Sequence, residues 1–239
     1  MSESIKAGRT LAQSEVDSIP RKLSPGQRWF SLGELALGSA LVIGHNVYHV
    51  IPNEVPMLFV LGLISVRLRD GSLAAMGLRR PVSWRQTVLF ALAASAVRIL
   101  AGIFVIDPLT ERFWPAAIAP TGADKIPGHV LATLASLLLV WTFAAFGEEI
   151  GYRGYLVTRA ADVGGRSNAA YWAGVLVVSV LFGVGHHYKG PAGMVDSGLA
   201  GLLLGAVYLL SGRNLWVCIL THGFIDTFLL IALYFGLQL

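Results

Sequence analysis

The chain has 239 residues, of which 55% are hydrophobic and only 13% are charged, and its mean hydropathy is +0.65. Soluble domains carry about 25% charged residues, so this composition excludes an ordinary soluble protein and indicates a membrane protein. The formal net charge of +4 comes from basic residues scattered between apolar runs, so a nucleic-acid partner is not expected.

The first 27 residues are polar and lack the short apolar core of a signal peptide, so we expect a cytoplasmic tail. Seven apolar stretches follow, judged against the roughly 20 residues that a helix needs to cross a bilayer. They lie at residues 29–50, 55–66, 87–106, 128–146, 169–187, 194–210 and 215–237. The predicted fold class is therefore all-α: a polytopic transmembrane bundle of about seven spans, between six and eight, with the active site among the last four.

The distribution of positive charge predicts the orientation, because Lys and Arg are retained on the cytoplasmic side of a membrane. With seven spans, 14 Lys and Arg residues fall on the side of the N-terminal tail and three on the other side. We therefore expect a multi-pass protein of the cell membrane with a cytoplasmic N-terminus. The sequence leaves the oligomeric state open.

Two carboxylates and an arginine end the apolar run that begins near Val130. Ionisable groups at membrane depth cost roughly 2.5 to 3.5 kcal/mol each, so they tend to mark function. Glu149 and Arg153 have the i, i+4 spacing at which side chains on one helix face meet, which predicts an ion pair. Glu148 has no evident local partner, which suits a general base. The alternative is that the cluster ends a spanning helix in the headgroup region.

Two further clusters carry histidine in later spans. Phe182 and His186 are four residues apart, which predicts an aromatic ring packed against an imidazole. Alone, a histidine at a helix end is more often an interfacial feature. His222 and Asp226 have the same spacing deep in the last apolar stretch, where packing does not explain them.

Two isolated charges in the earlier spans also need partners. Glu34 lies in the first apolar stretch and Arg98 in the third. Because a buried charge is costly without a counter-ion, we expect these two to pair as a structural bridge.

The three clusters, in this order on successive late helices, resemble the CPBP family of intramembrane proteases, which includes the type II CAAX prenyl endopeptidases and bacteriocin-processing proteins. The family pattern Glu-Glu-x-x-x-Arg, Phe-x-x-x-His and His-x-x-x-Asn/Asp is matched by Glu148-Glu149…Arg153, Phe182…His186 and His222…Asp226. Three spaced motifs are far more specific than any one of them. The resemblance covers about residues 127–230. With the polar tail, it leads us to expect three parts: a tail at residues 1–27, N-terminal transmembrane helices with a cytoplasmic connection at 28–126, and a catalytic helical core at 127–239.

The resemblance also implies roles for single residues. Glu148 and His186 would activate a water for attack on a peptide carbonyl, while His222 and Asp226 would support the oxyanion or orient the site. Glu149, Arg153 and Phe182 would support them. In the prenyl-protease branch the last position is typically Asn, and an ionised Asp cannot donate a hydrogen bond to an oxyanion. Asp226 must therefore be protonated, orient His222 or help to bind a metal.

The family has been described both as metalloproteases and as glutamate proteases. Glu148, His186, His222 and Asp226 offer nitrogen and oxygen ligands of the kind that zinc takes. The sequence has no His-Glu-x-x-His zinc motif, however, which favours catalysis without a metal.

The sequence thus predicts an intramembrane endopeptidase. Its partners would be membrane lipid and a membrane-associated peptide or protein substrate, either a prenylated CAAX-type peptide or a bacteriocin-like one. The alternative is a non-catalytic membrane protein: a scaffold, or a proton-coupled transporter that uses the buried Glu, His and Asp cluster. Convergence of Glu148, His186 and His222 on one cavity distinguishes the protease from this alternative.

Overall fold

The computed structural model describes residues 23–237, and within them every regular element is a helix, which confirms the all-α prediction. The first four elements are α2 (Pro25–Asn46), α3 (Glu54–Asp70), the 3₁₀ helix η1 (Leu73–Met76) and α4 (Trp84–Ala101). The others are η2 (Gly102–Ile106), α5 (Asp107–Thr110), η3 (Ala123–Lys125), α6 (Val130–Leu139), η4 (Val140–Leu156), α7 (Val157–Val163), α8 (Asn168–Val184), η5 (His187–Lys189), α9 (Gly190–Leu210) and α10 (Leu215–Tyr234).

The first helix begins inside the segment that the sequence assigns to the tail. Ser24 caps α2: its side chain accepts a hydrogen bond from the backbone of Gln27, and the Gln27 side chain accepts one from the backbone of Ser24. Such a capping box satisfies two of the free N–H groups at a helix start. The helix therefore starts at Pro25, while residues 1–22 lie outside the described part of the chain.

One continuous helix dominates the bundle. It comprises α6, η4 and α7 and runs for 34 residues from Val130 to Val163, well past the end of the apolar stretch at residue 146. Its middle part, η4, is a π-helix of 17 residues. Single π turns inside α-helices are often found at functional sites, and this one carries Glu148, Glu149 and Arg153.

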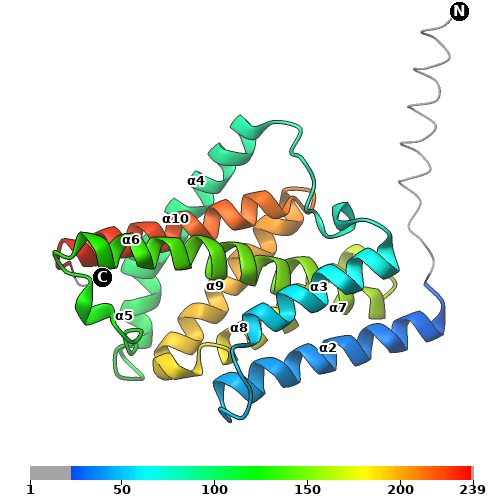
Figure 1. Cartoon of the computed structure of the whole chain (residues 1–239), viewed down its shortest axis with the longest axis horizontal. Coiled ribbons are helices and arrows are strands. Elements are labelled where there is room, and N and C mark those ends of the chain that lie inside the picture. The colour runs from blue at the N-terminus through cyan, green and yellow to red at the C-terminus, as the bar shows by residue number, and fades with distance from the viewer. Residues whose placement is uncertain (1–22, 238–239) are drawn as a thin grey trace, which may run out of the picture.

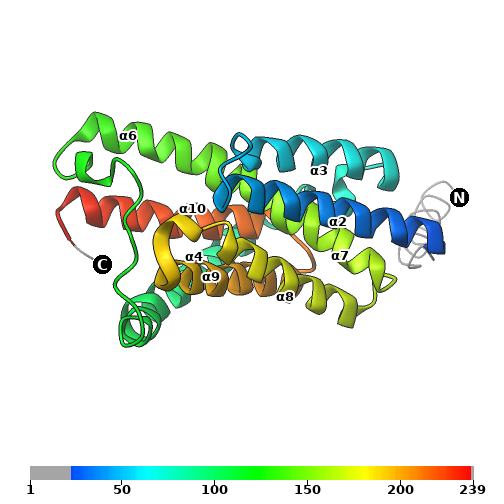
Figure 2. The same ribbon diagram turned by 90° about the horizontal axis from the view of Figure 1, so that it is seen from below.

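Four helices in the described residues are long and apolar enough to cross a membrane: Trp84–Thr110, Val130–Val163, His187–Leu210 and Leu215–Tyr234. The apolar helix α8 is shorter, at 17 residues. In Figures 1 and 2, α10 runs alongside α6, while α2, α3 and α7 gather at the other end of the molecule. This arrangement agrees with a helical membrane bundle.

Glycines let α3 lie unusually close to the long helix. A Cβ on Gly62 of α3 would stand 2.8 Å from Cβ of Tyr155, and a Cβ on Gly151 would stand 3.0 Å from Cβ of Leu58. Small residues of this kind allow the backbones of membrane helices to approach each other. The close contact brings the N-terminal helices against the segment that carries the carboxylate pair.

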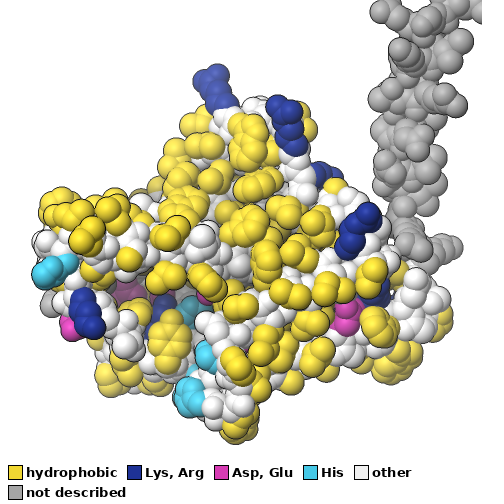
Figure 3. Space-filling model, viewed as in Figure 1, with side chains coloured by type: hydrophobic (Ala, Val, Ile, Leu, Met, Phe, Trp, Pro, Cys, Tyr) yellow, Lys and Arg dark blue, Asp and Glu magenta, His cyan; other side chains and the backbone are white. Residues whose placement is uncertain are grey.

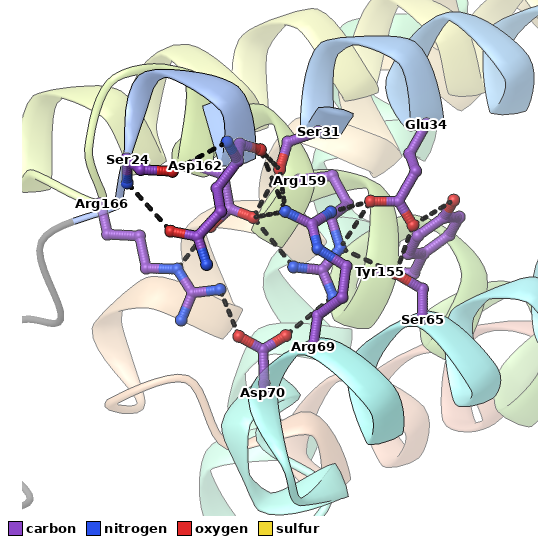
Figure 4. A network of polar contacts seen from close by, with 11 residues as sticks. Ser24, Ser31, Glu34, Ser65, Arg69, Asp70, Tyr155, Arg159, Asp162 and Arg166 are labelled. Carbon is purple, nitrogen blue, oxygen red and sulfur yellow. Dashed lines mark hydrogen bonds and ion pairs between the residues drawn. The ribbon is translucent and has the colours of Figure 1, made fainter. Parts of the chain in front are cut away.

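A network of buried charges joins α2, α3 and α7 at the end of the bundle opposite to the start of α6 (Figure 4). Arg159, which is fully buried, lies at its centre. Its Nη2 donates to Oδ2 of Asp70 at 2.7 Å and its Nη1 to Oδ2 of Asp162 at 2.8 Å. Arg166 binds the same two carboxylates, and Arg69 pairs with Glu34. Three arginines thus face three carboxylates, so the network is neutral overall.

The predicted bridge between Glu34 and Arg98 is wrong. Glu34 pairs with Arg69 and also lies 3.4 Å from Nε of Arg159, whereas Arg98 pairs with Asp196 on α9. Each charge pairs with a residue on another helix. The periodicity of the sequence does not show which helices lie next to each other.

Asp70 gives this network a dependence on pH. Burial alone would raise the pKa of Asp70, but Arg159 and Arg166 outweigh it and hold that pKa below its ordinary value of 3.8. A depressed pKa stabilises the fold above the ordinary value, and the gain is lost as the pH falls through the folded-state value.

We therefore expect Asp70→Asn to unfold more easily than the parent at pH 7, with the difference shrinking below about pH 4. Thermal unfolding of the detergent-solubilised protein at both pH values measures this. Asp124→Asn, at an exposed position, is the matched control. An equal difference at both pH values would contradict the assignment.

Candidate functional site

The acidic pair on η4 has the contacts that its spacing predicts. Nη1 of Arg153 donates to Oε1 of Glu149 at 2.8 Å, which confirms the predicted ion pair. Both side chains are almost completely buried. Nη2 of Arg153 also donates to the backbone oxygen of Gly201 on α9 at 3.3 Å. The pair therefore lies inside the bundle.

The same carboxylate binds the histidine of the last helix. Nδ1 of His222 lies 2.7 Å from Oε1 of Glu149. Oε1 of Glu149 accepts from Arg153, and a carboxylate oxygen of this kind also accepts from a ring N–H, so we assign the donor proton to Nδ1. Nε2 of His222 then faces Oδ2 of Asp226 at 3.5 Å. The sequence clusters on η4 and α10 thus meet at one oxygen atom.

Phe182 joins the third cluster to the other two. Its ring lies 4.6 Å from the His186 ring and 6.4 Å from the His222 ring, measured between centroids. The guanidinium of Arg153 lies over the same phenyl ring at 4.4 Å, a cation–π contact. The predicted packing of Phe182 against His186 is confirmed, and the phenyl ring also holds the site together.

The hydrogen bond of His186 determines which of its nitrogens is free. Nδ1 of His186 lies 2.8 Å from the backbone oxygen of Phe182. A carbonyl oxygen only accepts hydrogen bonds, so Nδ1 is the donor. In the neutral ring, Nε2 then has an unshared electron pair and can accept a proton or bind a ligand.

Glu148 and Glu149 each have one buried oxygen, Oε2, with no hydrogen-bond partner among the described residues. Glu149 is held through its other oxygen by Arg153 and His222, whereas Glu148 has no such contact with a described residue. The charges of His222 and Asp226 are close enough to act on it. A buried polar atom without a partner is uncommon and calls for an explanation such as a water or a substrate. The catalytic roles of Glu148, His186, His222 and Asp226 stay predictions.

One face of the molecule has a hollow in which acidic, basic and histidine side chains lie between apolar ones (Figure 3). In the site itself, the Asp226 side chain is 27% exposed and that of His222 is 10% exposed. A polar hollow in an apolar surface is the environment that intramembrane ionisable groups require.

Sequence reasoning missed two aromatic residues next to the site. The Tyr152 ring meets the Phe182 ring edge-on at 4.9 Å, and the Tyr188 ring lies 5.8 Å from the His186 ring. Tyr152 directly precedes Arg153 and Tyr188 follows the two histidines, so adjacency to the motifs was the available signal. The sequence alone does not show that these two rings point toward the site, because their surroundings depend on how the neighbouring helices pack.

The side chains do not form a ready metal site. Among the described residues, no group of three or more His, Cys, Asp and Glu side chains is arranged to hold a metal ion. Both ring nitrogens of His222 face carboxylates, at 2.7 and 3.5 Å. The nitrogen and oxygen donors are of the type that zinc accepts, but this arrangement does not bring them around a common point.

Comparison with known proteins gives one match. The family model described as "Rce1-like: Type II CAAX prenyl endopeptidase Rce1-like" matches residues 130–228. The matched segment runs from the start of α6 into α10 and contains all three clusters. No curated protein and no solved structure matches the chain.

Proposed function

We propose that the chain is an intramembrane endopeptidase, because residues 130–228 match the family model of the type II CAAX prenyl endopeptidase Rce1-like proteins. The observation that carries the proposal is the shared oxygen of Glu149, which Arg153 and His222 both bind. This contact joins two motifs from distant parts of the chain, and the Phe182 ring adds the third. The Arg159 network also shares buried carboxylate oxygens, but this cluster adds a histidine with a free ring nitrogen and an unpartnered carboxylate oxygen, the groups that general acid–base catalysis uses.

In the proposed mechanism, Glu148 and His186 activate a water molecule. The unpartnered Oε2 of Glu148 or Nε2 of His186 takes a proton from the water as its oxygen attacks the peptide carbonyl. The resulting oxyanion is stabilised by hydrogen bonds, and the proton passes to the departing amine as the C–N bond breaks. Glu149 binds Nδ1 of His222, so Nε2 is the ring nitrogen that remains available to the reacting atoms.

We further propose a membrane-associated peptide as substrate, either a prenylated CAAX-type peptide or a bacteriocin-like one. The apolar helices support this proposal because a lipidated or apolar peptide can reach the hollow from within the bilayer.

We also propose that the N-terminus is cytoplasmic in the cell membrane. Arg67, Arg79, Arg80 and Arg85 support this orientation, since all four are exposed at the adjoining ends of α3 and α4. Labelling of single introduced cysteines from each side of the membrane would test it.

Hydrolysis by purified protein in lipid vesicles tests the function. A farnesylated CAAX peptide and an unlipidated apolar peptide are incubated with the vesicles, and mass spectrometry identifies the cleaved bond. We expect cleavage at one position, and equal cleavage after treatment with a metal chelator. Loss of activity with the chelator and its return with zinc would replace the metal-free mechanism by a metal-dependent one.

The rival proposal, a proton-coupled transporter, draws on the same buried and unpartnered oxygen of Glu148. It predicts uptake into vesicles driven by a pH gradient, with no peptide bond broken. A scaffold predicts neither result. Cleavage in the absence of any gradient would rule out both alternatives as the main function.

Asp226 tests how the site differs from the usual family pattern. Its only described ion-pair contact is the 3.5 Å approach to Nε2 of His222. An Asn side chain could keep this contact and also donate an N–H group to an oxyanion. We expect Asp226→Asn to keep kcat within about tenfold, and Asp226→Leu to lower it about a hundredfold, because Leu cannot orient His222 through Nε2.

Steady-state hydrolysis of the same peptide by both variants of Asp226 measures this difference. If both variants were equally inactive, the negative charge itself would be required, which favours a metal ligand or an acid at this position.

A further inference from the structure

Lys189 lies next to the site and has no role in the mechanism above. It ends the 3₁₀ turn η5, which connects α8 to α9 and directly follows His186. Its backbone is held on both sides: its N–H donates to the oxygen of His186 at 2.9 Å, and its oxygen accepts from the N–H of Ile118 at 2.9 Å. The start of the lysine side chain is therefore fixed relative to the His186 turn.

The ammonium group of Lys189 has no fixed counter-ion. No carboxylate of the described residues lies within 4.0 Å of it, although the side chain is half-buried. Buried arginines elsewhere in the bundle, by contrast, each have an ion pair, such as Arg98 with Asp196 and Arg153 with Glu149. A half-buried cation without a partner is costly, so a role that supplies an anion would explain its presence.

The ammonium group of Lys189 lies close to the proposed reacting groups. Nζ lies 5.9 Å from the centre of the Tyr188 ring, and that ring lies 5.8 Å from the His186 ring. Its charge is close enough to act on both His186 and Asp226. Lys189 thus lies at one side of the site, about one aromatic ring beyond the histidine.

This spacing suits the end of a short peptide. In a C-a-a-X sequence, three residues follow the cysteine that carries the lipid. An extended chain spans about 3.3 to 3.6 Å per residue, so the terminal carboxylate lies roughly 10 Å beyond the bond that follows the cysteine. The Tyr188 ring lies 5.8 Å from the His186 ring and 5.9 Å from Nζ, so Nζ is no farther from the His186 ring than these two steps together, an upper limit that is compatible with that reach.

We propose that Lys189 binds the C-terminal carboxylate of the substrate and thereby selects peptides that end about three residues after the cleaved bond. This proposal rests on the proposed endopeptidase activity. It adds a specificity residue that the three motifs do not contain. An ammonium–carboxylate contact requires both a free terminus and the correct length, so the chain would discriminate against internal loops of longer proteins.

The test compares two farnesylated CAAX peptides that differ only at the C-terminus, which is a free carboxylate in one and a carboxamide in the other. For the wild-type protein in vesicles, we expect KM to be about tenfold lower for the free acid, as befits one charge-assisted hydrogen bond. Lys189→Met should raise KM for the acid to the value for the amide, so that the preference for the free carboxylate is lost. Lys189→Arg should restore most of the preference.

Lys125→Met is the matched control, because Lys125 is an exposed lysine in η3, outside the three clusters. Equal KM values for acid and amide with the wild-type protein would overturn the proposal, and this comparison needs no variant to fold. An equal loss for both peptides in Lys189→Met would also overturn it, since Lys189 would then act through Asp226. Glu148→Ala separates the two claims. If this variant cleaves neither peptide and the wild-type protein cleaves acid and amide with equal KM, the endopeptidase activity stands and only the role of Lys189 fails.

Discussion

Glu148→Gln is expected to lower kcat for peptide hydrolysis about a thousandfold and to leave the stability of the protein nearly unchanged. Gln keeps the shape of the side chain but cannot take a proton from water, and loss of a general base typically costs 10²- to 10⁴-fold. Stability should hold because Oε2 of Glu148 has no hydrogen-bond partner to lose. Single-turnover cleavage of a fluorogenic peptide, together with the melting temperature, measures both effects.

The neighbouring carboxylate provides the contrast. Oε1 of Glu149 binds both Arg153 and His222, so Glu149→Gln should lower the melting temperature as well as the activity. Glu111→Gln, at an exposed position, should change neither. If Glu148→Gln kept wild-type kcat, Glu148 would not be the base, and His186 would become the leading candidate through its free Nε2.

Arg159→Ala is expected to destabilise the protein by about 3 to 5 kcal/mol, the cost typical of removing one partner from a buried ion pair. Arg159 is fully buried and binds Asp70 and Asp162, with Glu34 also 3.4 Å from its Nε (Figure 4). Its removal leaves three carboxylates to share the two other arginines of the network. Equilibrium unfolding in mixed micelles compares the variant with the parent.

A surface arginine gives the matched control for Arg159. Arg80 is exposed, so Arg80→Ala should change the free energy of unfolding by less than about 0.5 kcal/mol. For Arg159→Ala, the fraction of protein that stays folded should hydrolyse peptide with unchanged KM, because the network lies apart from the hollow. Wild-type stability of Arg159→Ala would show that the surrounding charges rearrange at little cost.

Whether the sequence could predict a contact depends on how far apart the two residues lie along the chain. Contacts within one helical turn were predictable: Glu149 with Arg153, and Phe182 with His186, pair as their spacing requires. Regular helical geometry places residues four apart on one face whatever surrounds the helix. The contact between Glu149 and His222 joins residues 73 apart, and nothing in either helix alone specifies it.

The sequence by itself determined the apolar helices, the three motifs and the local pairs within them, because composition and periodicity act over a few residues. Only the tertiary structure decided that Glu34 meets Arg69 and not Arg98, that one oxygen of Glu149 binds groups on two helices, and that Lys189 has no ion pair among the residues that the structure describes. The physical reason is that helix packing depends on the shapes of whole surfaces. Glycines such as Gly62 and Gly151 allow α3 to approach the long helix, and the partners available to each buried charge follow from that approach.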